Sequence, residues 1–133
     1  MDVTPLLKRR LTEVPWVAFD TEATGYSNVS GRLVEIAGVR FTLTGGPAPE
    51  GEGAPVRIET TFAELANPGV PMPPEVVKIH GITDADVAGR PAPVEVLERF
   101  FAFIGDGVII AHYVPFDLGA MTYALLRVGK GVP

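Results

Sequence analysis

Residues 16–25 read Trp-Val-Ala-Phe-Asp-Thr-Glu-Ala-Thr-Gly, an apolar run that ends in two carboxylates one residue apart. The aromatic and β-branched residues of this run suit a buried strand, and residues two apart on a strand point to the same side. We therefore expect Asp20 and Glu22 to project together. Neighbouring carboxylates disfavour each other's charged form unless a cation lies between them, and hard ions such as Mg²⁺ or Mn²⁺ prefer such oxygen ligands. The alternative is a strand end with two solvated acids before a turn at Thr24-Gly25.

A third acid follows another apolar run far along the chain. Residues 107–117 read Gly-Val-Ile-Ile-Ala-His-Tyr-Val-Pro-Phe-Asp, which favours a strand, a turn and the start of a helix. Asp117 would lie in the first helical turn, where the helix dipole favours a charged carboxylate that points outward. The alternative is a helix-capping acid with no chemical role. The apolar residues that recur at helical spacing after it are Leu118, Met121, Leu125 and Val128.

These stretches resemble motifs of the DnaQ-like proofreading exonucleases, a superfamily named for the four acidic residues Asp-Glu-Asp-Asp. The resemblance is closest to bacterial polymerase III epsilon-subunit-like and polymerase-fused exonuclease domains. It covers about residues 14–128, with several motifs in the family's order. The matching segments are residues 19–25, 32–39, 67–69, 73–83 and 112–118.

The resemblance implies a site for two Mg²⁺ or Mn²⁺ ions, as in two-metal phosphodiester hydrolysis. Asp20 would bridge both ions, Glu22 would hold the ion that carries the attacking water, and Asp117 would support the second ion. His80 also has the alternative role of a capping or packed histidine before Gly81. The residues expected to line the site around the terminal nucleotide are Thr21, Ala23, Thr24, His80 and Phe116.

The family's third motif, a histidine followed by the fourth acidic residue, should lie some tens of residues after Asp117. Residues 118–133 contain no Asp, Glu or His. In the family this histidine takes the proton from the attacking water, a role worth about 10²- to 10⁴-fold in rate. We therefore expect this chain alone to be weakly active or inactive. Two smaller departures are Tyr113, where relatives usually carry Asn, and Ala23, where they often carry Thr.

Composition favours a single soluble domain over residues 1–133. The chain is 47% hydrophobic and has no cysteine, and no stretch approaches the ~20 apolar residues that span a bilayer. We expect a cytoplasmic protein without membrane contact. The formal net charge of −5 is unusual for a nucleic-acid binder. Divalent cations at the site would, however, meet the phosphate directly.

The first half of the chain suits a short helix or arm followed by strands. Residues 5–13 are the arm, with Leu6, Leu7 and Leu11 inward. Two further strands are expected at residues 32–43 and 56–65, because both runs are long and contain many apolar residues. The Gly- and Pro-rich segment between them is expected to be a hairpin loop.

Two helices are expected before the strand at 107–110. Pro73-Pro74 opens a short helix that Gly81 ends, with Val76 and Ile79 inward. A longer helix follows Pro93, and Phe100 has no place on its apolar stripe. The residues on that stripe are Val94, Leu97, Phe101 and Ile104.

This order predicts an α/β domain with a mixed β-sheet flanked by helices. By resemblance it is the ribonuclease H-like fold, without the C-terminal strand and helices of the family. Their absence would leave part of the sheet and the helix after Asp117 uncovered. Such an apolar patch favours self-association.

The function expected from the resemblance is a metal-dependent 3′-to-5′ exonuclease that acts on the single-stranded 3′ end of DNA. It would release nucleoside monophosphates in proofreading or repair, with a polymerase or helicase as partner. RNA stays open as a substrate, because strand ends are recognised largely through stacking and backbone contacts. Two alternatives are a non-catalytic nucleic-acid-binding module and an interaction domain that keeps the fold without the site.

Overall fold

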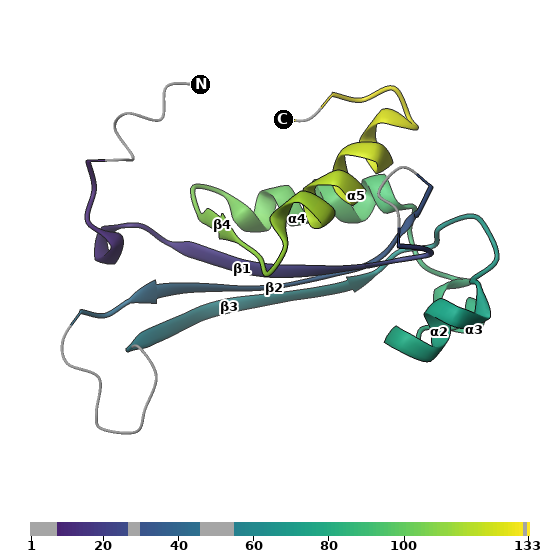
Figure 1. Cartoon of the computed structure of the whole chain (residues 1–133). Coiled ribbons are helices and arrows are strands. Elements are labelled where there is room, and N and C mark those ends of the chain that lie inside the picture. Colours follow the sequence, from purple (N-terminus) through teal and green to yellow (C-terminus); the bar gives the residue numbers. More distant parts are fainter. Residues whose placement is uncertain (1–7, 27–29, 46–54, 132) are drawn as a thin grey trace.

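The computed structural model describes residues 8–26, 30–45, 55–131 and 133. A four-stranded mixed sheet has the order β3-β2-β1-β4, and helices α4 and α5 lie on one face of it (Figure 1). This architecture confirms the predicted α/β fold. The elements are η1 Leu11–Glu13, β1 Trp16–Ala23, β2 Leu33–Leu43, β3 Val56–Leu65, α2 Pro74–His80, α3 Asp84–Val87, α4 Pro93–Ile104, β4 Val108–Ile110 and α5 Val114–Leu126.

Strand β1 lies inside the sheet, between the long strand β2 and the short strand β4. It pairs antiparallel with β2 from Trp16, opposite Phe41, to Ala23, opposite Leu33. It pairs in parallel with β4 only over residues 16–18. Because β4 ends at Ile110, opposite Ala18, the second half of β1 has no strand on that side. The first turn of α5 lies there instead.

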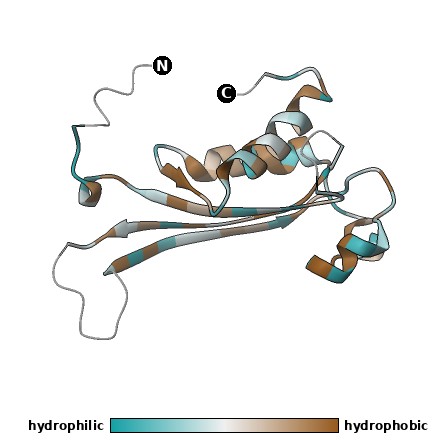
Figure 2. Ribbon diagram, viewed as in Figure 1, coloured by the Kyte–Doolittle hydropathy of each residue, from teal (hydrophilic) through white to brown (hydrophobic). Residues whose placement is uncertain are grey.

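Side chains alternate along β1 between a buried face and an open face. The strand extends from Trp16 through Ala23, so both Asp20 and Glu22 belong to it. Figure 2 shows that each of the long strands carries both hydrophobic and hydrophilic residues. The β1 residues on the buried face are Val17, Phe19, Thr21 and Ala23.

The main core lies between the sheet and helices α4 and α5, and Phe100 is its largest fully buried side chain. The Phe100 ring is fully buried and lies 5.5 Å from the ring of Phe19 and 5.4 Å from that of Phe62. The prediction that left Phe100 outside the stripe was wrong, because β2 offers Gly38 at the contact. A Cβ at Gly38 would lie 3.1 Å from the rings of both Phe100 and Phe103. The buried stripe of α4 is Val96, Leu97 and Phe100, with Val94, Phe101 and Ile104 only partly buried.

Helices α2 and α3 form a second small core at one end of the sheet (Figure 1). Val34 of β2 packs there with Met72, Val76, Ile82 and Val87. Gly81 ends α2 in the left-handed conformation, with φ 75°, as predicted. The inward placement of Ile79 was wrong. A seven-residue helix presents only one turn to this core, and Ile79 is exposed beside it.

Helix α5 begins at Val114, so Asp117 lies in its first turn, as predicted. Of the apolar residues at helical spacing, Met121 and Leu125 are buried, whereas Leu118 and Val128, the latter beyond the end of α5, are exposed. The face that packs on the sheet carries small residues at helical spacing, and it begins with an acid. The buried residues of α5 are Asp117, Ala120, Met121, Ala124 and Leu125.

The N-terminal prediction holds only in part. Leu11 lies in the 3₁₀ turn η1 and is exposed rather than inward. Leu6, Leu7 and residues 46–54 of the predicted loop lie outside the described residues. In the part of the chain that the structure describes, no helix combines the length and apolar character needed to cross a membrane.

Arg40 of β2 connects the edge strand β3 to the turn between α4 and β4. Its guanidinium donates to Ile104 O and Asp106 Oδ1, both at 2.6 Å, and to Glu59 Oε2 at 3.1 Å. The hydrogen bond from Arg40 lowers the pKa of Asp106. Gly107 lies under this network, because a Cβ there would be 2.8 Å from Val17 Cγ2 and 2.9 Å from Ile104 O.

Replacing Gly107 by Ala should therefore destabilise the fold. Overpacking of this kind costs about 1–3 kcal/mol, and we expect a urea midpoint lowered accordingly in Gly107→Ala. The control is Gly89→Ala, where a Cβ would meet no atom within 4 Å. Equal midpoints for the two variants would contradict the close approach at Gly107.

Candidate functional site

The two acids of β1 lie on its open face, as expected for residues two apart on a strand. Asp20 is exposed and Glu22 is partly buried. Across the ladder, Glu22 is paired with Glu35 of β2. Burial raises the pKa of Glu22, and the charge of Asp20 raises it further, with a smaller contribution from Glu35. No ion pair of Glu35 is found within the described residues.

Asp117 reaches the same region from α5, but its carboxylate points inward. Its side chain is 3% exposed, so the predicted outward orientation was wrong. Two donors of Thr21 meet one oxygen of this carboxylate. The backbone N–H lies 3.1 Å and the hydroxyl 2.7 Å from Oδ1. Burial raises the pKa of Asp117 in spite of these bonds, and the charge of Asp20 adds to the rise.

The fold thus brings together three acids that are far apart in the sequence. Asp20, Glu22 and Asp117 lie close enough for the charges of Asp20 and Asp117 to raise the pKa of Glu22. Carboxylates that resist joint ionisation fit a hard divalent cation chemically. Across residues 8–26, 30–45, 55–131 and 133, however, no three acidic or histidine side chains lie close enough to hold one ion. The metal site stays a prediction.

A pocket of about 100 Å³ opens beside Glu22, between the end of β1 and helices α2 and α5. Three of the residues predicted around the nucleotide line it: Ala23, His80 and Phe116. Thr21 and Thr24, which were also predicted there, do not line it. Thr24 Oγ1 instead accepts the backbone N–H of Arg32 at 3.0 Å. The other lining residues, which the sequence reasoning missed, are Gly25, Tyr26, Val76 and Ile79.

His80 lines the pocket and also makes the local contact expected of a packed histidine before Gly81. Its Nδ1 accepts the backbone N–H of Ile82 at 3.0 Å, which fixes the ring at the end of α2. Its Nε2 is buried with no hydrogen-bond partner among the described residues. Because Nδ1 accepts, Nε2 carries the proton of the neutral ring. A positive charge on His80 would lower the pKa of Glu22, so the two side chains are electrostatic neighbours.

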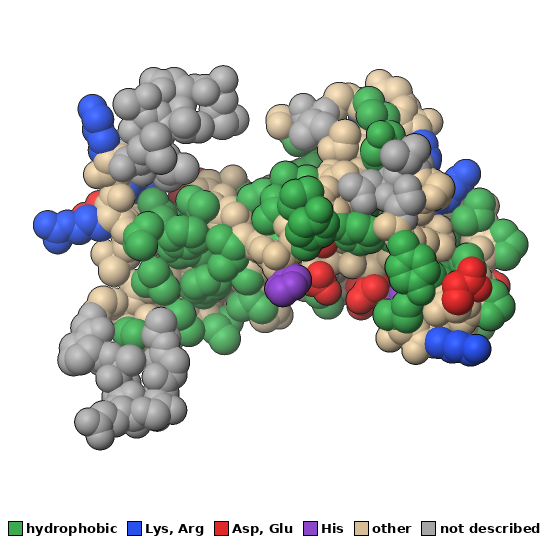
Figure 3. All heavy atoms as spheres, in the orientation of Figure 1, with side chains coloured by type: hydrophobic (Ala, Val, Ile, Leu, Met, Phe, Trp, Pro, Cys, Tyr) green, Lys and Arg blue, Asp and Glu red, His purple; other side chains and the backbone are tan. Residues whose placement is uncertain are grey.

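Figure 3 shows acidic and histidine side chains gathered in the middle of one face, between groups of hydrophobic side chains. The exposed apolar residues Tyr26 and Ile79 were the signal that could have indicated the pocket. Neither belongs to a core, yet both lie beside an acid-bearing strand end. A large apolar side chain left exposed at such a place is available to contact a ligand.

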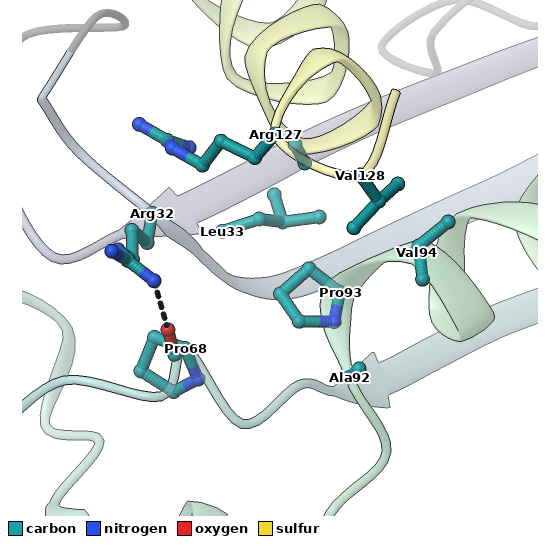
Figure 4. Close-up of a pocket in the computed structure, with 9 residues that line it drawn as sticks. Arg32, Leu33, Pro68, Ala92, Pro93, Val94, Arg127 and Val128 are labelled. Carbon is teal, nitrogen blue, oxygen red and sulfur yellow. Dashed lines mark hydrogen bonds between the residues drawn. The ribbon is translucent and has the colours of Figure 1, made fainter. Parts of the chain in front are cut away.

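A second pocket lies at the other end of α5, away from Asp117 (Figure 4). Arg32 and Arg127 are its charged residues, and Arg32 Nη1 donates to Pro68 O at 3.3 Å. No site residue predicted from the sequence lines it. The remaining lining residues are Leu33, Pro68, Ala92, Pro93, Val94, Ala124 and Val128.

The raised pKa of Glu22 predicts a pH-dependent gain in stability for Glu22→Gln. An acid with a raised folded-state pKa binds more protons in the folded state, so its ionisation destabilises the fold as pH rises through that pKa. Glu22→Gln removes this loss. We expect its melting temperature to exceed that of the wild type at neutral pH, and the difference to vanish at acidic pH, where Glu22 is protonated in both states.

The control for this measurement is Glu75→Gln, on the exposed side of α2. It should show no gain at neutral pH, because it loses only a favourable contact with the helix dipole. A Glu22→Gln variant without a neutral-pH gain, or with the same gain at acidic pH, would refute the account of Glu22.

Three relatives are informative for this geometry. The chain is 39% identical over 126 residues to a DNA polymerase III subunit epsilon-like protein of Rhodobacter capsulatus, covering 94% of this chain and 16% of that protein. It is 31% identical over 112 residues to the DNA polymerase III subunit epsilon of Aquifex aeolicus, covering 84% of this chain and 50% of that protein. A solved structure of exonuclease X in complex with 5′ overhanging duplex DNA matches with a TM-score of 0.58 and 28% identity, covering 79% of this chain and 52% of that one.

This chain therefore spans half or less of the length of both sequence relatives and about half of the matched exonuclease X chain. The family model described as Exonuclease matches residues 17–133, a stretch that includes both acids of β1, the pocket and Asp117. The chain belongs to the exonuclease family.

Proposed function

We propose that this chain is a divalent-metal-dependent exonuclease domain that removes nucleotides from the 3′ end of single-stranded DNA. The observation that carries the proposal is the meeting of three acids on two elements. Asp20 and Glu22 come from β1, Asp117 comes from α5, and a pocket opens beside Glu22. One side of the site thus offers oxygen ligands, and the other offers a wall for a nucleotide.

Asp20, Glu22 and Asp117 would hold the ions. Bound divalent ions supply an activated water and stabilise the leaving oxygen in phosphodiester hydrolysis. The raised pKa values of Glu22 and Asp117 support this role, because the unfavourable ionisation would be relieved by a cation. The exposed carboxylate of Asp20 lies on the side from which a phosphate arrives.

The pocket beside Glu22 would bind the terminal nucleotide. Its apolar side chains, among them Ile79 and Phe116, suit a base or sugar face. The Nε2–H of His80 is a buried donor that lacks a partner among the described residues, and a ligand oxygen would satisfy it. The chain itself therefore provides orientation of the strand end, through Ala23, His80 and Phe116.

DNA is the substrate that the relatives favour. Two of them are named as polymerase III epsilon proteins or epsilon-like proteins, and the matched structure is a complex with DNA. These names support a proofreading or repair role beside a polymerase. No Asp, Glu or His occurs in residues 118–133, so we propose that the 133-residue chain on its own is only weakly active.

A strand-shortening assay tests this function. Single-stranded DNA and RNA labelled at the 5′ end are incubated with the chain in Mn²⁺, Mg²⁺ or chelator. We expect slow, metal-dependent shortening of DNA from its 3′ end, blocked by 3′ phosphorothioate linkages and lost in Asp20→Asn. Glu75→Gln, at an exposed residue of α2 that does not line the pocket, is the control and should cleave like the wild type.

Several results would contradict the proposal in different ways. Internal cleavage, or shortening that persists in chelator or in Asp20→Asn, would rule out the proposed site. Preferential shortening of RNA would correct the substrate. Metal-dependent binding of the strand end without any product would identify the non-catalytic module instead.

A further inference from the structure

We propose that Thr21 is a positioning residue whose hydroxyl and amide hold the carboxylate of Asp117 in the orientation that binds the divalent cation. This inference rests on the proposed function and assigns it a residue that touches neither the ion nor the substrate. It replaces the nucleotide contact that the sequence suggested for Thr21. That contact does not fit a side chain that is 5% exposed and lies outside the pocket.

Two hydrogen bonds from Thr21 to Asp117 make this contact, and together they are called the clasp below. The amide N–H and the hydroxyl of Thr21 both donate to the same oxygen of Asp117, Oδ1, at 3.1 and 2.7 Å. Two donors on one oxygen fix both the position and the rotation of the carboxylate. Oδ2 lies outside this contact. Both residues are buried, so water does not compete for the bonds, and charge-assisted hydrogen bonds are among the strong ones in proteins.

Apart from a backbone hydrogen bond of Asp117 itself, which affects its pKa less than the bonds from Thr21 do, helix α5 provides no comparable restraint on this carboxylate among the described residues. Its N-cap residue, Tyr113, makes no side-chain capping bond. Among the described residues, Thr21 is the one side chain that hydrogen-bonds the carboxylate of Asp117. The orientation of the α5 acid is therefore set by β1.

Thr21 lies where it can fix the positions of the three acids relative to one another. It stands between Asp20 and Glu22, and strand alternation sends its side chain to the buried face while theirs go to the open face. Three consecutive residues of β1 thus supply two acids and the anchor of the third. Partners of this kind, behind a metal ligand, typically change metal affinity by about 10- to 100-fold when they are removed.

The chain contains a matched control for this clasp. Thr83 donates both its N–H and its hydroxyl to Oδ2 of Asp86, each at 2.7 Å. This second clasp caps the short helix α3 and is exposed. Thr83→Val therefore removes the same kind of bond at a residue that neither contacts Asp117 nor lines the pocket beside Glu22.

The experiment compares the wild type with Thr21→Val, Thr21→Ser and Thr83→Val. Valine keeps the β-branched shape and the backbone N–H of Thr21, but its side chain cannot donate a hydrogen bond. Serine keeps the hydroxyl. Mn²⁺ affinity is measured by titration calorimetry, melting temperature is measured in chelator, and DNA shortening is followed in parallel. We expect Thr21→Val to bind Mn²⁺ about tenfold or more weakly. Thr21→Ser should restore most of the affinity, and Thr83→Val should lower the melting temperature without changing the affinity.

The possible outcomes distinguish a failure of the proposed role of Thr21 from a failure of the proposed exonuclease function. If the wild type binds Mn²⁺ and shortens DNA while folded Thr21→Val binds the ion equally well, the clasp is overturned and the function stands. A loss in Thr21→Val that serine does not repair also overturns the role of the hydroxyl. If the wild type neither binds Mn²⁺ nor shortens DNA, the proposed function fails, and the clasp falls with it.

Discussion

The hydrogen bonds from Thr21 to the carboxylate of Asp117 join the two parts of the candidate site. A buried acid without a partner would destabilise the fold, and these bonds offset that cost where α5 meets β1. The rest of the structure makes the contact available. Strand β4 pairs with β1 only over residues 16–18, and α5 then packs through Ala120 and Ala124, whose small side chains allow close approach.

The candidate site contains neighbouring like charges, which lower the stability of the fold. Glu22 faces Asp20 along the strand and Glu35 across the ladder, and its pKa is raised by burial and by these charges. A sequence selected only for stability would not place like charges directly opposite on a sheet. Binding of a cation and a phosphate, as proposed, would account for these charges beside a pocket that contains the buried donor of His80.

The sequence predicted the features that depend on local periodicity. Asp20 and Glu22 were placed on one side of a strand because alternation is set within a few residues, and Gly81 was placed at the end of α2 for the same reason. The family followed from ordered motifs. What failed depended on distant partners: the burial of Asp117 needs Thr21, 96 residues away, and that of Phe100 needs Gly38 on another strand.

In the proposed function, Asp20, Glu22 and Asp117 together bind a divalent cation. Anomalous diffraction from crystals of this chain soaked in Mn²⁺ tests it most directly, since the ion itself is located. The account predicts an anomalous peak in contact with carboxylate oxygens of β1 and with Asp117, and its loss in Asp20→Asn. A peak elsewhere, or none at these acids in well-ordered crystals, would contradict it.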